Sequence, residues 1–321
     1  MPRTLIRKNP SNFKTLPIFV EATPEGLTYQ SVGMPLNFTQ TLARRRKIDV
    51  EDSERFSTEL ANLGVSVRLT LRWQNRDYWV LVRQRRQDRG DVVLKLISGY
   101  VPAHELNLPL HTAVQEVAEE CLIETPQGWL GGRFNETWLP APYAAALHYR
   151  EAMPFRLTPL SGAARPVRCG SLTLIERPRA YVHLPTASLQ LIYDMRLEVP
   201  KEARPLSLFH VDESLENNEL VARLNRSKPD LYLMPLENGS PLPELYTLKN
   251  DKLSPAGTRG LYLAESFAPQ EGWVVREERI RWKDWLVQQG MTPKKKPKSG
   301  LTKLRIKARR LVRLVRSGLH K

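Results

Sequence analysis

The chain has 321 residues, of which 41% are hydrophobic and 26% are charged. This composition is typical of a folded globular protein with one large or two smaller domains. No apolar run reaches the roughly eighteen residues of a membrane-spanning helix, and the first residues lack the apolar segment of a secretory signal, so we expect a cytoplasmic protein. The two cysteines, Cys121 and Cys169, favour structural thiols over a disulfide framework or a zinc site.

The net charge of +15 is concentrated at the C-terminus. Residues 291–321 contain seven lysines, five arginines and no acidic residue, so they contribute +12 and leave about +3 for the other 290 residues. The body of the protein is therefore nearly balanced in charge, and the overall excess does not by itself indicate a nucleic-acid-binding domain.

The first half of the chain predicts an N-terminal extension or small lobe followed by a hairpin. Residues 1–64 are mixed in character and suggest no role. Apolar residues alternate with polar ones from Val65 to Leu71 and again from Tyr78 to Val82, and the residues QNRD between them favour a turn, so 65–82 predicts a β-hairpin. The apolar run 92–97 leads into a loop from Gly99 and then a helix over about 110–122.

The second half mixes predicted strands and helices. We expect strands in 171–178, 188–199, 230–236 and 260–266, and helices in 212–224 and 277–290, the last ending at Gly290. Interspersed elements of both kinds predict an α/β (α+β) fold in which helices pack on a sheet. The expected organisation is an extension at 1–64, a main domain with insertions at 65–290, and a basic linker and helical tail at 291–321.

The helix at 110–122 has one apolar face and one acidic face. Glu116, Glu119 and Glu120 project together from the side opposite the apolar stripe. Like charges at this spacing cost about 0.2–0.5 kcal/mol per pair, and carboxylates late in a helix oppose its dipole. A hard cation such as Mg²⁺ or Mn²⁺ would offset both effects, whereas a solvated acidic surface needs no ligand. The apolar stripe consists of Leu110, Ala113, Val114, Val117, Ala118 and Cys121.

The surrounding segment resembles the box of the Nudix hydrolases. In that family the box runs Gly, five residues, Glu, seven residues, Arg-Glu, an aliphatic, any residue, Glu-Glu, any residue, Gly and an aliphatic. Here Gly99 is followed after five residues by Glu105, and after nine more by QEVAEECLI, residues 115–123. The strand pair before Gly99 is also similar to the family's. The resemblance implies a mixed β-sheet sandwiched between helices.

This chain departs from the family pattern at three points. The loop between Glu105 and Gln115 is two residues longer, Gln115 stands in place of the arginine, and Leu122 stands in place of the glycine that ends the helix. An amide can still hydrogen-bond a carboxylate, so Gln115 remains a supporting residue for Glu116.

The resemblance also implies an activity and a set of site residues. It implies hydrolysis of the diphosphate bond of a nucleoside diphosphate linked to another group, with Mg²⁺ or Mn²⁺ held by Glu116, Glu119 and Glu120. One of these glutamates or a nearby carboxylate would act on the attacking water, with Glu213 or Glu216 in reserve. The carbonyl of Gly99 would join the metal ligands, and Glu105 would support them. Arg83, Arg85 and Arg86 are candidates for cations that hold the phosphates, with a role as solvated surface residues as the alternative for each.

A second hypothesis is a domain with the same fold but without catalytic activity. Because of the three departures, the domain can also be an inactive ligand-binding or scaffold module, tethered to a membrane or nucleic acid by its tail. Residues 301–319 form a basic amphipathic pattern that favours an anionic membrane surface or a protein groove, with nucleic acid less favoured because no aromatic residue is present to stack on bases. Folding of the tail back onto the domain is the alternative. The sequence carries no pattern for the oligomeric state or the substrate's identity.

Overall fold

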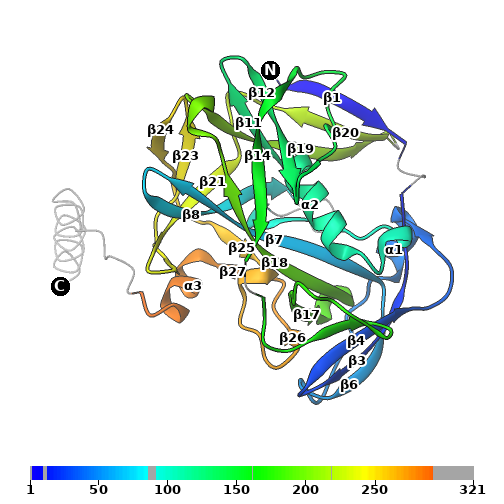
Figure 1. The fold of residues 1–321 in the computed structure, drawn as a ribbon. Coiled ribbons are helices and arrows are strands. Elements are labelled where there is room, and N and C mark those ends of the chain that lie inside the picture. Colours follow the sequence, from blue (N-terminus) through cyan, green and yellow to red (C-terminus); the bar gives the residue numbers. More distant parts are fainter. Residues whose placement is uncertain (1, 10–12, 86–91, 161, 218, 292–321) are drawn as a thin grey trace, which may run out of the picture. The chain divides into compact units, whose positions relative to one another are not determined.

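The computed structural model describes residues 2–9, 13–85, 92–160, 162–217 and 219–291 (Figure 1). The chain divides into two compact units, residues 1–285 and 286–321. The expected extension, residues 1–64, belongs to the first unit, and its expected end falls inside strand β7 (Asn62–Trp73). The expected amphipathic helix at 301–319 lies outside the described residues. None of the helices in the described part of the chain has the length and apolar character needed to cross a bilayer.

Strands make up 52% of the structure, so the expected α/β fold with a sheet sandwiched between helices is wrong. The described residues contain three α-helices, α1 (Phe38–Arg44), α2 (Pro109–Glu120) and α3 (Trp282–Gln288), too few to cover both faces of a large sheet. Twenty strands of the described residues instead connect into one mixed sheet. They are β1 (Arg3–Lys8), β7, β8 (Arg76–Arg85), β9 (Val92–Lys95), β10 (Ile97–Tyr100), β11 (Cys121–Thr125), β12 (Gly128–Phe134), β13 (Thr137–Trp138), β14 (Tyr149–Pro159), β17 (Arg179–His183), β18 (Ser188–Glu198), β19 (Ser207–Glu216), β20 (Glu219–Leu224), β21 (Leu231–Glu237), β22 (Ser240–Pro241), β23 (Tyr246–Lys249), β24 (Lys252–Pro255), β25 (Tyr262–Ala264), β26 (Val274–Val275) and β27 (Arg279–Arg281).

Strand β7 is the centre of this sheet. It pairs antiparallel with β8, with Leu69 opposite Val80, which confirms the predicted hairpin. Its other partners are β18, in a long parallel register, and β10, which is antiparallel. The apolar residues from Leu63 to Trp73 alternate along one face of β7 and belong to the main hydrophobic core, and the polar residues Asn62, Ser66 and Thr70 of the other face are buried as well. The alternation in the sequence therefore located the strand but did not show that both faces are covered.

The predicted helix at 212–224 is a hairpin of β19 and β20, in which Val211 pairs with Leu224. Asn217 lies at the turn with φ of +49°, a left-handed conformation that asparagine adopts more readily than most residues. The prediction of a helix at 277–290 is also partly wrong, because this segment contains strand β27 and becomes helical only at Trp282. The strands expected at 188–199, 230–236 and 260–266 are present as β18, β21 and β25. The strand expected at 171–178 is reduced to the two residues of β16 (Leu172–Thr173).

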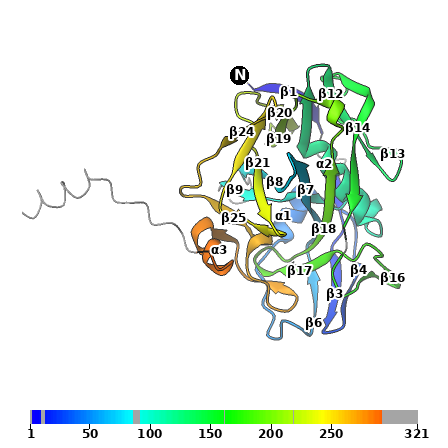
Figure 2. The same ribbon diagram turned by 60° about the vertical axis from the view of Figure 1, so that its left-hand side comes forward.

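A smaller five-stranded sheet brings N-terminal residues together with residues near 170. Its strands β3, β4 and β6 lie together at one end of the first unit in both views (Figures 1 and 2). The short pair β2 (Lys14–Thr15) and β5 (Leu36–Asn37) precedes α1. The five strands are β3 (Ile18–Thr23), β4 (Gly26–Ser31), β6 (Phe56–Leu60), β15 (Val167–Cys169) and β16.

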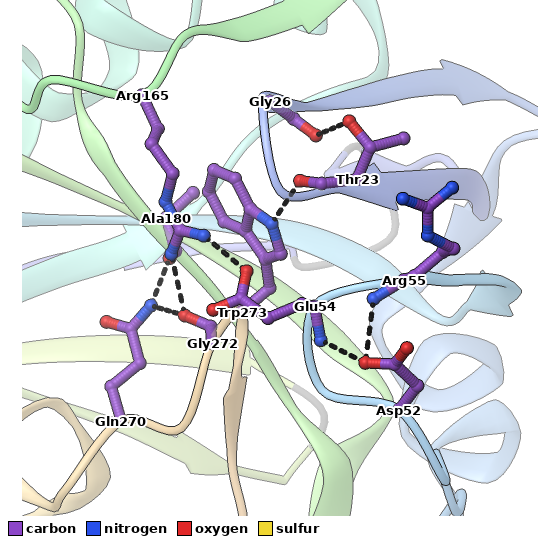
Figure 3. A network of polar contacts seen from close by, with 10 residues as sticks. All are labelled: Thr23, Gly26, Asp52, Glu54, Arg55, Arg165, Ala180, Gln270, Gly272 and Trp273. Atoms are coloured by element: carbon purple, nitrogen blue, oxygen red, sulfur yellow. Dashed lines mark hydrogen bonds and ion pairs between the residues drawn. The ribbon is translucent and has the colours of Figure 1, made fainter.

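Trp273 joins this N-terminal sheet to the C-terminal part of the unit (Figure 3). Its ring is buried, and its Nε1 donates a hydrogen bond of 2.8 Å to the carbonyl of Thr23. The guanidinium of Arg165 lies over the ring at 3.7 Å from the centroid and donates to Glu54 Oε2 at 2.6 Å and to the carbonyl of Gly272 at 2.9 Å. One side chain thus links segments that are 250 residues apart in sequence.

We expect Trp273→Ala to lower the free energy of unfolding by about 3–5 kcal/mol, because it removes a large buried ring, a hydrogen bond and the surface under Arg165. Urea unfolding followed by circular dichroism measures the change. Trp138→Ala is the matched control, since Trp138 is 45% exposed and also lies beneath an arginine. A loss of under 1 kcal/mol in the Trp273 variant would show that this contact does not hold the N-terminal sheet in place.

Candidate functional site

Helix α2 forms where the sequence predicted it. Pro109 occupies its first turn, where the missing N–H costs nothing, and Val114 and Val117 are buried against the sheet. The chain leaves the helix through Cys121, whose φ of −114° and ψ of 89° are not helical, and enters β11 at once. This exit does not use the left-handed conformation that favours glycine, so Leu122 is compatible with it. Leu122 is itself buried and lies opposite Phe209 of β19.

The acidic face of α2 lines a cavity of about 1130 Å³. The same cavity is bordered by β10, by β19 and by N-terminal residues around β2 and α1. All six residues that the sequence assigned to the site lie on its wall, together with Glu213, which was named only as a reserve. The six are Gly99, Glu105, Gln115, Glu116, Glu119 and Glu120.

Gly99 and Glu116 are in unusually close contact. A Cβ atom placed on Gly99 would lie 1.8 Å from Oε1 and 2.1 Å from Cδ of Glu116. Glycine is therefore required at this position by the approach of the carboxylate to the strand, because any other residue would displace Glu116. Among the described residues, no hydrogen-bond or ion-pair partner approaches the Glu116 carboxylate, which borders the cavity.

Glu120 is held by protein groups instead. Its Oε1 is 3.2 Å from Nζ of Lys95, and its Oε2 accepts a hydrogen bond of 3.3 Å from the backbone N–H of Ser98. Lys95 also donates to the side chain and the carbonyl of Ser98, and both charged side chains are mostly buried, with 11% exposure each. This pair ties the end of α2 to the strand that carries Gly99.

Glu213 adds a fourth carboxylate from outside the box. It comes from β19, the strand wrongly expected to be a helix, and lies near Glu119 and Glu120. Glu216, the other candidate for the carboxylate that acts on water, accepts a hydrogen bond from the guanidinium of Arg223 and is not part of the cavity wall. The sequence pattern did not separate the two, because their roles depend on which face of β19 meets α2.

Burial and mutual repulsion raise the pKa values of these carboxyl groups. The pKa of Glu116 lies well above its ordinary value. Burial is the main cause, and repulsion from Glu120 and Glu119 adds to the shift. Burial also raises the pKa of Glu119, and it raises that of Glu213 to about 7, with repulsion from Glu119 contributing. Lys95 and Lys8 act in the opposite direction on Glu213. Four carboxylates facing two ammonium groups leave a formal excess of two negative charges when all are ionised.

Glu105 and Gln115 occupy supporting positions. Glu105 is buried, accepts a 2.7 Å hydrogen bond from the hydroxyl of Thr112 and lies 2.9 Å from Nδ1 of His111, so it fastens the preceding loop to the first turn of α2. Within the described residues, the side-chain hydrogen bond of Gln115 goes to Nε2 of His111 at 3.3 Å and not to Glu116. Gln115 therefore does not support Glu116 through the hydrogen bond expected from the sequence.

The donor types in the cavity suit a hard cation, although the side chains do not form a ready-made site. The described residues contain no group of three or more acidic, histidine or cysteine side chains that could hold a metal ion as they stand. Mg²⁺ usually takes only one or two protein carboxylates and completes its shell with water and substrate phosphates. The carboxylates of Glu116 and Glu119 make no hydrogen bond or ion pair with the described residues, and they meet that smaller requirement.

Cationic side chains border the same cavity. Of the three arginines expected to hold phosphates, Arg85 is on the wall, Arg83 is not, and Arg86 lies outside the described residues. Lys8, Lys14 and Arg45 also line the cavity, and sequence reasoning missed them because they come from the N-terminal segments. No pattern in residues 1–64 indicated that these segments reach the acidic helix.

Comparison of the sequence with models of known protein families, and with characterised proteins, gives no match.

The raised pKa values predict a pH dependence of stability for the metal-free protein. The folded state keeps protons on these carboxyl groups to higher pH than the unfolded state does, so the free energy of unfolding falls as pH rises from about 4.5 to 7. Glu213→Gln removes one such group, and we expect it to be more stable than the wild type by about 1–3 kcal/mol at pH 8 and nearly equal to it at pH 4.5.

Thermal unfolding in chelator across this pH range tests the expectation. The exposed Glu237→Gln is the control and should follow the wild-type curve at every pH. A Glu213→Gln variant that is less stable than the wild type at pH 8 would mean that Glu213 makes a stabilising contact larger than its electrostatic cost.

Proposed function

We propose that this protein is a Nudix-type, Mg²⁺-dependent hydrolase that cleaves the diphosphate bond of a nucleoside diphosphate linked to another group. The observation that carries the proposal is the group of carboxylates on one cavity, with Glu116 pressed against Gly99 and without a protein partner among the described residues. A buried excess of negative charge costs folding free energy, and a site that binds a cation recovers that cost.

The charges around the cavity suit an anionic substrate with a metal ion. Glu116 and Glu119 would hold the cation, and Glu120, fixed by Lys95 and Ser98, would complete the acidic side. A bound Mg²⁺ neutralises phosphate charge and lowers the pKa of water. Glu213, whose pKa burial and neighbouring carboxylates raise to about 7 in the metal-free protein, is suited to accept a proton near neutral pH. Lys8, Lys14 and Arg85 on the cavity wall supply positive charge for phosphate oxygens.

One observation favours the second candidate, an inactive ligand-binding or scaffold module. Lys95 already provides a buried cation within the acidic group, and Glu120 is engaged with it. In a binding module this internal ion pair would take the place of the metal. The two functions differ in one measurable property, which is turnover that depends on a divalent cation.

The test is a substrate panel with Mg²⁺ or Mn²⁺ that contains nucleoside diphosphate sugars, dinucleoside polyphosphates, NADH, ADP-ribose and nucleoside triphosphates. Added phosphatase frees the terminal phosphates that cleavage exposes, so every substrate gives the same readout. Cation-dependent phosphate release that is lost in Glu120→Gln supports the hydrolase. Silence across the panel, from folded protein with metal supplied, would leave the binding module as the better account.

The proposal includes a cytoplasmic setting, with the basic residues 301–319 directing the protein to an anionic membrane surface. Deleting residues 291–321 should abolish co-sedimentation with vesicles that contain anionic lipid. Unchanged sedimentation of the shortened protein would remove the tail from the proposal and leave the hydrolase untouched.

A further inference from the structure

Part of the cavity wall carries flat side chains that come from the N-terminal segment and from β10. Phe38 begins helix α1, Tyr100 ends strand β10, and Arg45 follows α1; all three line the cavity and are half-buried. The rings of Phe38 and Tyr100 are 6.2 Å apart between centroids, with an interplanar angle of 33°. The guanidinium of Arg45 lies over the ring of Tyr100 at 4.7 Å from its centroid. We call these three side chains the aromatic wall.

The aromatic wall is held in place by the structure around it. Asn37 and Gln40 form a reciprocal capping box at the start of α1, with hydrogen bonds of 2.9 and 3.0 Å, which fixes the turn that carries Phe38. The guanidinium of Arg45 donates from Nε and Nη2 to Oδ1 of Asn62 at 3.3 and 3.2 Å. A surface fixed in this way loses little entropy when a planar ligand stacks on it.

The wall lies in the same cavity as the acidic group and the cations. Tyr100 directly follows Gly99 in β10, so its side chain leaves the strand on the face opposite to the contact between Gly99 and Glu116, and both residues line the same cavity. Lys8 lines the same cavity as Glu119 and Glu213 and partly offsets the rise of their pKa values, so a positive charge lies near these carboxylates. A ligand that spans this cavity therefore meets flat rings on one side and charged groups on the other.

We propose that the aromatic wall binds the nucleobase of the substrate, so that the N-terminal segment selects nucleotides over other diphosphates. The inference rests on the proposed function for the position of the phosphates, but the recognition of the base does not depend on turnover. Planar heteroaromatic rings stack on aromatic and guanidinium groups, whereas inorganic diphosphates and sugar phosphates have no ring to place there. Residues 1–64, which suggested no role in the sequence, thereby supply two of the three side chains of the aromatic wall, Phe38 and Arg45.

The test is equilibrium binding of ADP, ribose 5-phosphate and pyrophosphate to the full chain, measured by calorimetry without turnover. Tyr100→Leu and Phe38→Leu should each weaken ADP binding about tenfold and leave pyrophosphate binding within about twofold of the wild type. Tyr100→Phe keeps the ring and should retain ADP affinity. Trp138→Ala, which removes a ring that also packs with an arginine but lies outside this cavity, is the matched control and should bind ADP as the wild type does.

The possible outcomes test base binding by the aromatic wall independently of the proposed hydrolase activity. Selective loss of ADP binding in the two leucine variants, with unchanged thermal unfolding, supports the wall even if the substrate panel shows no turnover. Equal weakening of ADP and pyrophosphate, or no change in either, would overturn it. If the protein cleaves a substrate that has no nucleobase in a cation-dependent reaction, and does not bind ADP, the proposed hydrolase activity would stand and the proposed role of the aromatic wall would be wrong.

Discussion

Glu116→Gln is expected to reduce cation-dependent turnover of the substrate found in the panel by about 10³-fold and to leave the protein at least as stable as the wild type. The two effects have one cause. Glu116 makes no hydrogen bond or ion pair with the described residues, and burial and neighbouring carboxylates raise its pKa well above the ordinary value. Removing its charge therefore removes a ligand from the cavity and relieves repulsion within it.

The neighbouring glutamates provide controls that separate a role in binding from a role in folding. Glu120→Gln weakens the buried pair with Lys95 and the hydrogen bond from Ser98, so we expect losses of both activity and stability. Glu105→Gln disturbs the contacts to Thr112 and His111 and should destabilise the loop with a smaller loss of turnover. Activity, Mn²⁺ affinity and thermal unfolding are measured on the same preparations. Retention of more than a tenth of wild-type turnover by Glu116→Gln would exclude it as an essential ligand.

Gly99→Ala is expected to lower turnover nearly as much as Glu116→Gln, although it changes no charged group. The added methyl would lie 1.8 Å from the Glu116 carboxylate, which must rotate away. Because the displaced atoms are the end of a flexible side chain, we expect the fold to survive with a cost of about 1–3 kcal/mol. Gly257→Ala is the control, since a Cβ at that position meets nothing within 4 Å.

A double-mutant cycle tests whether Gly99 acts through Glu116. If it does, Glu116→Gln will cause little further loss of turnover in the Gly99→Ala background, so the two effects will be strongly non-additive. Independent, additive losses would show instead that the glycine serves the substrate or the strand directly. The cycle also separates the box from the aromatic wall, because neither variant changes a side chain of that wall.

Local features of the fold were predictable where a single periodic pattern decided them. The hairpin of β7 and β8, the strand β18 and the helix α2 with its buried valines were all predicted from apolar spacing. The hairpin of β19 and β20 was mistaken for a helix because its polar residues are compatible with either form, and the turn at Asn217 was not recognised. The sandwich of helices around a sheet was inferred from those mistaken elements and from the resemblance, and it is wrong.

The sequence by itself determined that Glu116, Glu119 and Glu120 share one side of a helix, because helical spacing places them together and away from a continuous apolar stripe. It also determined that Gly99 lies shortly before that helix. Only the tertiary structure decided which groups face them. Lys95, Glu213, Lys8 and Tyr100 reach the cavity through strand pairings and folding of the N-terminal segment, and such long-range contacts depend on packing and register, which no local pattern specifies.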